Sequence, residues 1–166
     1  MLEPDYYFES VFEIPYGKLK EKNISGLIFD IDNTLTAYDE EKPSEKTKEL
    51  LQNLHDMGFK ICLLTNNTGR RLGRFNQELG LPGFASALKP FTFGLKKAMK
   101  TMEVGAGQTA IIGDQLFTDV WAGKNVGIVT ILVKPITQKD FVFVNFKRII
   151  EKRVLRKFFA NLKQAE

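Results

Sequence analysis

The sequence predicts an α/β fold, a Rossmann-like three-layer sandwich with helices on both faces of a mostly parallel five-stranded sheet. Two observations support it: short apolar runs alternate with amphipathic stretches, and each apolar run ends in polar residues. Strands that alternate with helices of about ten residues are joined by right-handed crossovers, and they therefore lie parallel. The length of 166 residues is sufficient for one domain with its own core.

The expected strands are short aliphatic runs, and the helices between them carry apolar residues at helical spacing. Ser44 can cap the first of these helices and Gly58 can end it, while Gly80 can end the second. We expect strands at 27–31, 60–64, 84–87, 109–112 and 129–133, and helices at 44–57, 70–79, 93–102 and 116–124.

The C-terminal segment differs from the rest of the chain in charge. Residues 134–166 contain nine Lys or Arg and three Asp or Glu, a net charge of +6, whereas the preceding residues carry −2. Apolar residues recur at helical spacing within 146–163, so we expect a basic amphipathic helix. We assign it to the same domain as residues 1–133, of which 1–24 form an N-terminal segment. Its apolar face packs on the domain, or its basic face binds an anionic membrane, RNA or a protein.

Two aspartates follow the first expected strand, which is the apolar run 27–29. Asp30 and Asp32 are one residue apart at its end. Carboxylates do not help a buried strand to pack, but the carboxyl ends of parallel strands are where ligands bind. One carboxylate can therefore attack a substrate while the other moves a proton. An acidic turn without chemistry is the alternative.

The other expected strands also end in polar residues. Thr65 and Asn66 follow the second strand, Lys89 the third, and Asp114 and Asp119 the fourth. All of these ends lie at one edge of a parallel sheet. Several aspartates in one place raise one another's pKa unless a cation is present, and oxygen ligands suit Mg²⁺. A divalent metal beside a lysine is a suitable place for a phosphate group.

In that order, the motifs Asp-x-Asp-x-Thr, Thr, Lys and Gly-Asp-x-x-x-x-Asp resemble the haloacid dehalogenase superfamily over about residues 25–130. The second aspartate of the first motif is typical of its phosphatase branch. The resemblance implies that Asp30 is the nucleophile that forms an aspartyl-phosphate, and that Asp32 is the general acid and base. It further implies that Thr65, Asn66 and Lys89 bind the phosphate, with Lys89 balancing charge.

The resemblance also implies a Mg²⁺ site. Asp30, Asp114 and the backbone carbonyl of Asp32 would be its ligands. Asp119 would either support a water molecule on the metal or position Lys89.

A narrower resemblance covers nearly the whole chain. The segments 4–20, 32–35, 118–123 and 130–133 are similar to the YqeG-type subfamily, which is similar to phosphatidylglycerophosphate phosphatases. This similarity implies a membrane phospholipid substrate that is dephosphorylated to phosphatidylglycerol. Only 34 residues separate Asp32 from Asn67, and a helix uses many of them, so a large cap domain is not expected.

The sequence therefore indicates a Mg²⁺-dependent phosphomonoester hydrolase that acts on phosphatidylglycerophosphate. A phosphatase of small soluble esters and a non-catalytic RNA- or protein-binding module are the alternatives. No secretory signal or membrane-spanning run is visible, so we expect a cytoplasmic protein, with peripheral contact at the inner face of the membrane through the basic helix. Nucleic acid is not the expected partner. The sequence is compatible with a homodimer.

Overall fold

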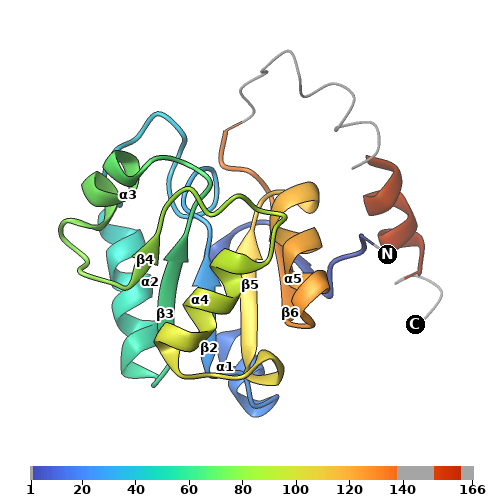
Figure 1. Ribbon diagram of the computed structural model, residues 1–166. Coiled ribbons are helices and arrows are strands. Elements are labelled where there is room, and N and C mark those ends of the chain that lie inside the picture. Colours follow the sequence, from blue (N-terminus) through green and yellow to red (C-terminus); the bar gives the residue numbers. More distant parts are fainter. Residues whose placement is uncertain (1, 138–151, 162–166) are drawn as a thin grey trace.

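A single parallel sheet forms the centre of the protein in the computed structural model, which describes residues 2–137 and 152–161. Its strand order is β1-β6-β5-β2-β3-β4, and every neighbouring pair runs parallel (Figure 1). The chain thus leaves the centre of the sheet in both directions, as in doubly wound α/β folds. The strands are β1 (Tyr6–Phe8), β2 (Gly26–Phe29), β3 (Lys60–Leu64), β4 (Gly83–Phe84), β5 (Thr109–Gly113) and β6 (Val129–Val133).

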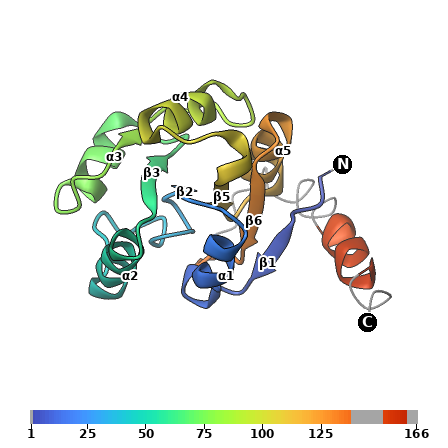
Figure 2. The same ribbon diagram turned by 90° about the horizontal axis from the view of Figure 1, so that it is seen from below.

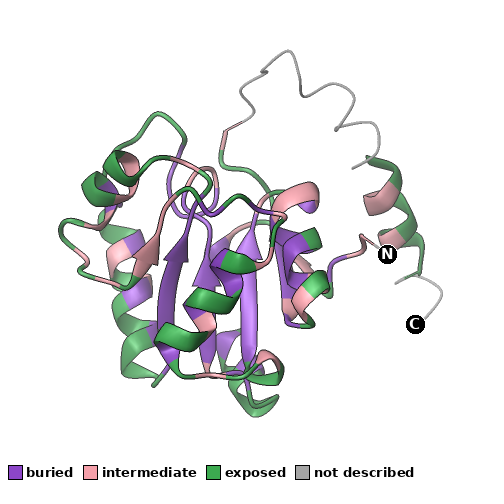
Figure 3. Ribbon diagram, viewed as in Figure 1, coloured by how far each residue is buried: buried purple, intermediate pink, exposed green. Residues whose placement is uncertain are grey.

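Helices cover both faces of this sheet, as the sequence predicts. The helices are α1 (Tyr16–Glu21), α2 (Glu45–Asp56), α3 (Gly69–Asn76), α4 (Phe93–Met102) and α5 (Trp121–Val126). Figure 2 shows α1 and α2 on one face and α4 and α5 on the other. Successive side chains of the strands alternate between these faces: Leu27 and Phe29 pack in one cluster, Ile28 in the other. Figure 3 shows the central strands buried between the two layers.

The predicted elements are confirmed with small shifts, and the sheet has six strands rather than five. Helix α2 begins after Ser44, whose hydroxyl accepts a hydrogen bond from the Thr47 N–H. The expected strand 84–87 ends earlier, because Ser86 and Leu88 adopt positive φ angles of 48° and 53°. The expected helix 116–124 is a π-helical turn, Leu116–Val120, followed by α5.

The N-terminal segment adds two elements that the apolar pattern does not predict, α1 and the edge strand β1. Asp5 ties β1 to β6, because its Oδ2 accepts hydrogen bonds from both the backbone N–H and the hydroxyl of Thr130, each at 2.8 Å. Lys124 makes an ion pair with the other oxygen at 2.5 Å. Burial raises the pKa of Asp5, but Lys124 and Thr130 outweigh it and lower the pKa below its ordinary value.

In the C-terminal segment, the structure describes residues 134–137 and a helix over 152–161. Val154 and Leu155 pack against a buried cluster that includes Leu132 of β6. The ring of Phe159 meets that of Tyr7 edge-on, with centroids 5.3 Å apart. The apolar face of this helix therefore lies on the domain, while the rest of the expected helix 146–163 lies outside the described residues. Among helices in the described ranges, none is long and apolar enough to cross a membrane.

We predict that Asp5→Asn lowers the free energy of unfolding by roughly 0.5–1 kcal/mol at neutral pH, a modest loss because the pair is partly exposed. The folded pKa of Asp5 is depressed, so its contribution is present above the unfolded pKa and is lost as the pH falls through the folded value. Urea unfolding of both proteins at neutral pH and near pH 3 tests this. A stability difference that stays constant down to that pH would contradict an ionised Asp5.

Candidate active site

The predicted site residues meet at the edge of the sheet where β2, β3 and β5 end (Figure 1). The Asp30 N–H still pairs with the Ile112 carbonyl at 2.9 Å, so its carboxylate starts from the rigid end of β2. Beyond it the chain turns tightly, because the Ile31 carbonyl accepts the N–H groups of Thr34 and Leu35 at 3.2 and 3.0 Å. This turn keeps Asp32 at the same edge.

Lys89 lies at the centre of the site, with its side chain only 2% exposed. Its ammonium group donates to Asp30 Oδ1 at 2.7 Å, to Asp119 Oδ1 at 2.5 Å and to the Leu64 carbonyl at 3.1 Å. All three N–H donors of the ammonium are thus used. Burial lowers the pKa of Lys89, but the carboxylates of Asp119 and Asp30 outweigh this effect and raise the pKa, so the lysine is charged.

The two residues after β3 lie at the same edge of the sheet and bond its neighbouring segments. The Asn66 side chain brackets the backbone of Lys89, accepting from its N–H at 2.7 Å and donating to its carbonyl at 3.0 Å. The Thr65 hydroxyl, in a residue that is 1% exposed, accepts a hydrogen bond from the Asn67 N–H at 3.0 Å. Its own hydrogen has no acceptor among the residues described, so it can be donated to a ligand.

Three carboxylates form an acidic cluster around Lys89. Asp30, Asp114 and Asp119 each bring one oxygen to within 4.8 Å of the others. Burial raises the pKa of Asp30 to about 7, and Asp119 adds to this effect while Lys89 opposes it. Burial and then Asp30 and Asp119 also raise the pKa of Asp114 well above its ordinary value.

Fully ionised, these three carboxylates and the one ammonium carry a net charge of −2. Such a buried excess is unfavourable without a cation, and hard oxygen ligands are those that Mg²⁺ prefers. The donor set and its charge therefore fit a divalent metal ion.

Gly113 makes room for this cluster. A Cβ built on it would overlap the carboxyl group of Asp119, and it would also lie 2.6 Å from the Asp119 Cβ. Asp119 is 2% exposed, and its Oδ2 accepts the Gln115 N–H at 3.2 Å. The absence of a side chain at the end of β5 thus lets Asp119 reach Lys89 directly.

The Asp32 side chain lies apart from the acidic cluster. Its oxygens accept from Arg71 Nε at 2.9 Å and from Asn67 Nδ2 at 3.0 Å. The two terminal nitrogens of Arg71 are buried and have no hydrogen-bond partner in the part of the chain that is described. The sequence motifs do not include Arg71, although its spacing of four from the buried Phe75 places it on the inner face of α3.

The segment after β6 is also tied to the site. Asn33, with a φ angle of 61°, accepts the Thr137 hydroxyl at 2.6 Å through its side chain and the Ile136 N–H at 3.1 Å through its carbonyl. Thr34, next along the chain, donates its hydroxyl hydrogen to Asp114 Oδ1 at 3.2 Å. No periodicity in the sequence indicates these contacts, because they join segments at least 80 residues apart.

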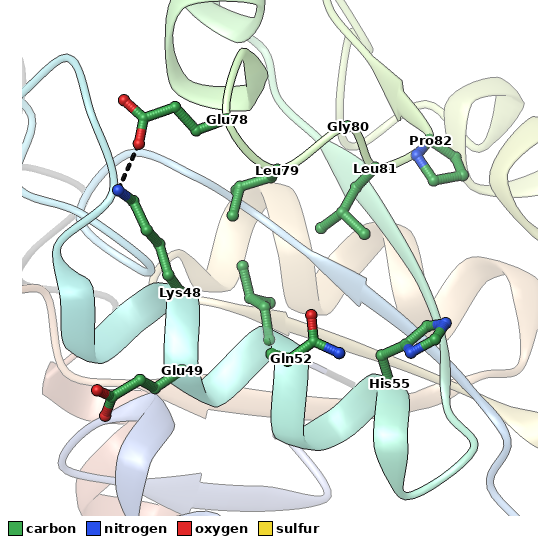
Figure 4. Close-up of a pocket in the computed structure, with 10 residues that line it drawn as sticks. Lys48, Glu49, Gln52, His55, Glu78, Leu79, Gly80, Leu81 and Pro82 are labelled. Atoms are coloured by element: carbon green, nitrogen blue, oxygen red, sulfur yellow. Dashed lines mark hydrogen bonds and ion pairs between the residues drawn. The ribbon is translucent and has the colours of Figure 1, made fainter.

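A cavity of about 640 Å³ lies elsewhere, on the outer side of α2 (Figure 4). It is lined by α2 and by the segment from Glu78 to Pro82, and Lys48 bonds Glu78 across it. None of the carboxylates of the acidic cluster lines this cavity. His55, exposed over 73% of its side chain, contributes to its wall rather than to the site.

Comparison with known proteins identifies the family. Residues 35–127 match the family model of haloacid dehalogenase-like hydrolases. The chain is 36% identical over 152 residues to "Probable phosphatase YqeG" of Bacillus subtilis (strain 168), covering 92% of this chain and 88% of that protein.

Two further relatives are more distant. "Glyceraldehyde 3-phosphate phosphatase" of Pyrococcus abyssi is 26% identical over 131 residues, which cover 74% of this chain and 53% of the relative. "Phosphatidylglycerophosphate phosphatase 1, chloroplastic/mitochondrial" of Arabidopsis thaliana is 26% identical over 146 residues, covering 79% and 40%. The chain therefore spans about half or less of the length of these two proteins.

A solved structure shares the fold. The cobalt-bound deoxy-D-mannose-octulosonate 8-phosphate phosphatase of Haemophilus influenzae superposes with a TM-score of 0.54 at 21% identity, covering 84% of this chain and 91% of that one. The family model covers more than half of the chain, and the relative of similar length is named a phosphatase. The chain belongs to the haloacid dehalogenase-like hydrolases, as a phosphatase of that family.

Proposed function

We propose that this phosphatase is a Mg²⁺-dependent phosphomonoester hydrolase that works through an aspartyl-phosphate on Asp30. The ammonium of Lys89, bonded to both Asp30 and Asp119, is the observation that carries the proposal. It leaves Asp30 Oδ2 without a partner among the described residues, and it holds positive charge beside that oxygen. A nucleophile placed next to a fixed cation suits attack on a phosphate dianion.

In the first step, Asp30 Oδ2 forms a bond to phosphorus as the bond from phosphorus to the leaving oxygen breaks. Asp32 protonates that oxygen, and the product alcohol departs. Thr65 donates its hydroxyl hydrogen to a phosphoryl oxygen. The backbone N–H of Asn66, which bonds no other described residue, donates to the same group.

In the second step, Asp32 takes a proton from a water molecule as that water attacks phosphorus. The bond between phosphorus and Asp30 breaks, so inorganic phosphate leaves and both aspartates return to their starting states. Arg71 and Asn67 hold the Asp32 carboxylate in place through both steps. Hydrolysis of a phosphate monoester needs accelerations of up to about 10²¹-fold, and covalent catalysis, proton transfer and fixed charge would act together to lower its barrier.

Mg²⁺ would be held by the carboxylates of Asp30 and Asp114 and by the backbone carbonyl of Asp32. Asp119, which bonds Lys89, would support these ligands. The ion would neutralise charge on the phosphate and orient it. The raised pKa values of Asp30 and Asp114 support a cation here, since it would stabilise both carboxylates in their ionised form.

We propose phosphatidylglycerophosphate as the substrate. The similarity to the Arabidopsis enzyme supports it, as does the short chain between Asp32 and Asn67, which holds α2 and leaves the phosphate site without an inserted cap. The Pyrococcus relative supports the second candidate, a small soluble phosphate ester. A basic C-terminal segment suits an anionic membrane in the first case.

We predict that Asp30→Asn lowers phosphatase activity by at least about 10³-fold, because the amide cannot form the covalent intermediate. Phosphate release from p-nitrophenyl phosphate with Mg²⁺ measures it, and the thermal unfolding midpoint shows that the variant is folded. A folded variant with normal turnover would refute the assigned nucleophile.

We predict that Gly113→Ala lowers activity roughly a hundredfold, because its methyl group displaces the Asp119 carboxyl from Lys89. Gly73→Ala is the matched control, since Gly73 lies in α3 with nothing near its Cβ position. The control should keep full activity and gain about 0.5–1 kcal/mol of stability. Equal activity of the two variants would mean that Asp119 is not needed in its observed place.

We predict that phosphate release from phosphatidylglycerophosphate in mixed micelles exceeds that from soluble phosphomonoesters, and that chelation with EDTA abolishes it until Mg²⁺ is restored. Each substrate is compared at equal concentration, with Asp30→Asn as the blank. Activity confined to soluble esters would refute the lipid substrate, and activity that EDTA does not change would refute the metal.

A further inference from the structure

Large apolar side chains are exposed on both sides of the active site. In the segment between β4 and α4, Leu88 is 67% exposed and Phe91 72%, and Phe93 at the start of α4 is 76% exposed. Lys89, in the middle of this segment, is one of the most buried polar residues of the site. Ile136, which bonds the Asn33 carbonyl, is 51% exposed at the other side.

The local backbone conformation holds these apolar side chains in their exposed positions. Leu88 has a φ angle of 53°, a conformation that a large side chain rarely adopts. The Phe91 N–H donates to the Leu88 carbonyl at 2.9 Å, and Asn66 clamps the backbone of Lys89 between them. The segment is therefore held at the site while its apolar side chains point to solvent. Clusters of exposed apolar groups of this kind mark interaction surfaces.

The helix that follows carries only positive charge. Lys96, Lys97 and Lys100 lie on α4, which has no acidic residue between Phe93 and Met102. None of these three lysines makes an ion pair with another residue in the described ranges, and all three are exposed. The ammonium of Lys97 lies over the ring of Phe84 at 4.4 Å from its centroid. Aromatic and aliphatic side chains next to unpaired lysines are the combination that binds an anionic membrane interface.

We propose that Leu88, Phe91 and Phe93 insert among the headgroups of an anionic phospholipid bilayer, with Lys96 and Lys97 on the lipid phosphates. The inference rests on the proposed function, because a phosphatase of lipid headgroups has to meet its substrate at the bilayer surface. The surface that makes this contact is the rim of the active site, formed by Leu88, Phe91 and Phe93. The described helix of the C-terminal segment instead packs its apolar face on the domain.

A second copy of the chain fits this surface less well. A symmetric dimer uses the same patch on both subunits, so it would bring the lysines of two α4 helices together without acidic partners. Like charges at an interface are unfavourable, whereas an anionic bilayer neutralises them.

The test is flotation of the full chain with vesicles of phosphatidylcholine alone and with added phosphatidylserine, an anionic lipid that lacks a phosphomonoester. We expect binding to the anionic vesicles, and a loss of at least about tenfold in affinity for the double variant F91S/F93S. Met57→Ser is the matched control: Met57 is 38% exposed at the end of α2, next to the start of β3, and the change should leave binding intact.

Hydrolysis of p-nitrophenyl phosphate by the same preparations separates this inference from the proposed function. We expect F91S/F93S to keep the soluble activity of the unchanged protein, so a loss of vesicle binding is not a loss of the site. Normal soluble activity without vesicle binding would overturn the bilayer proposal alone, while vesicle binding without activity on any ester would overturn the proposed function alone. Binding that F91S/F93S leaves unchanged, or a dimer that this variant dissociates, would overturn the assignment of the surface.

Discussion

The rest of the site depends on the hydrogen bonds that the buried ammonium group of Lys89 donates. It bonds a carboxylate at the end of β2, a carbonyl at the end of β3 and a carboxylate just after β5, so one side chain joins three strand ends. Neither partner is favourable alone, because an isolated lysine or aspartate in this environment would lose its charge. The strand order explains how they meet: β3 and β5 flank β2 and run parallel to it, so their carboxyl ends form one edge.

Most of this arrangement is predictable from sequence, because two strong regularities act together. Buried parallel strands produce apolar runs that are easy to locate, and the polar residues that end them share an edge by geometry alone. Strands β3 and β6 and helix α4 accordingly have the predicted bounds. Edge elements lack this signal: β1 has only three residues, all half-buried, and it forms because Asp5 bonds Thr130 from a position 125 residues away.

Sequence patterns do not reveal the residues that position the site side chains through hydrogen bonds. Arg71 differs from its neighbour Arg70 only in the face of α3 that it occupies, and a motif centred on the strand ends does not include that helix. Asn33 and Thr137 likewise meet because β6 ends beside the turn that follows β2, which only the assembled sheet reveals. The approach of Asp119 to Gly113 has a weak sequence signal, a glycine directly before an aspartate motif, but the role of that glycine is visible only from the space it leaves.

The buried residues of the site and the surface around it have different roles in the proposed function: the first react with phosphate, and the second meets the surface that presents the substrate. In the proposed mechanism, Asp30, Thr65 and Lys89 interact with the phosphoryl group that every phosphomonoester shares, so they would not discriminate among leaving alcohols. An inserted domain that closes over the leaving group would supply such discrimination, but the chain between Asp32 and Asn67 holds α2, β3 and the turns that connect them. The exposed apolar side chains beside Lys89 lie around the site, where they face solvent. On the bilayer proposal, these side chains would favour esters presented at a membrane surface, because they would bring the site to that surface rather than contact the alcohol.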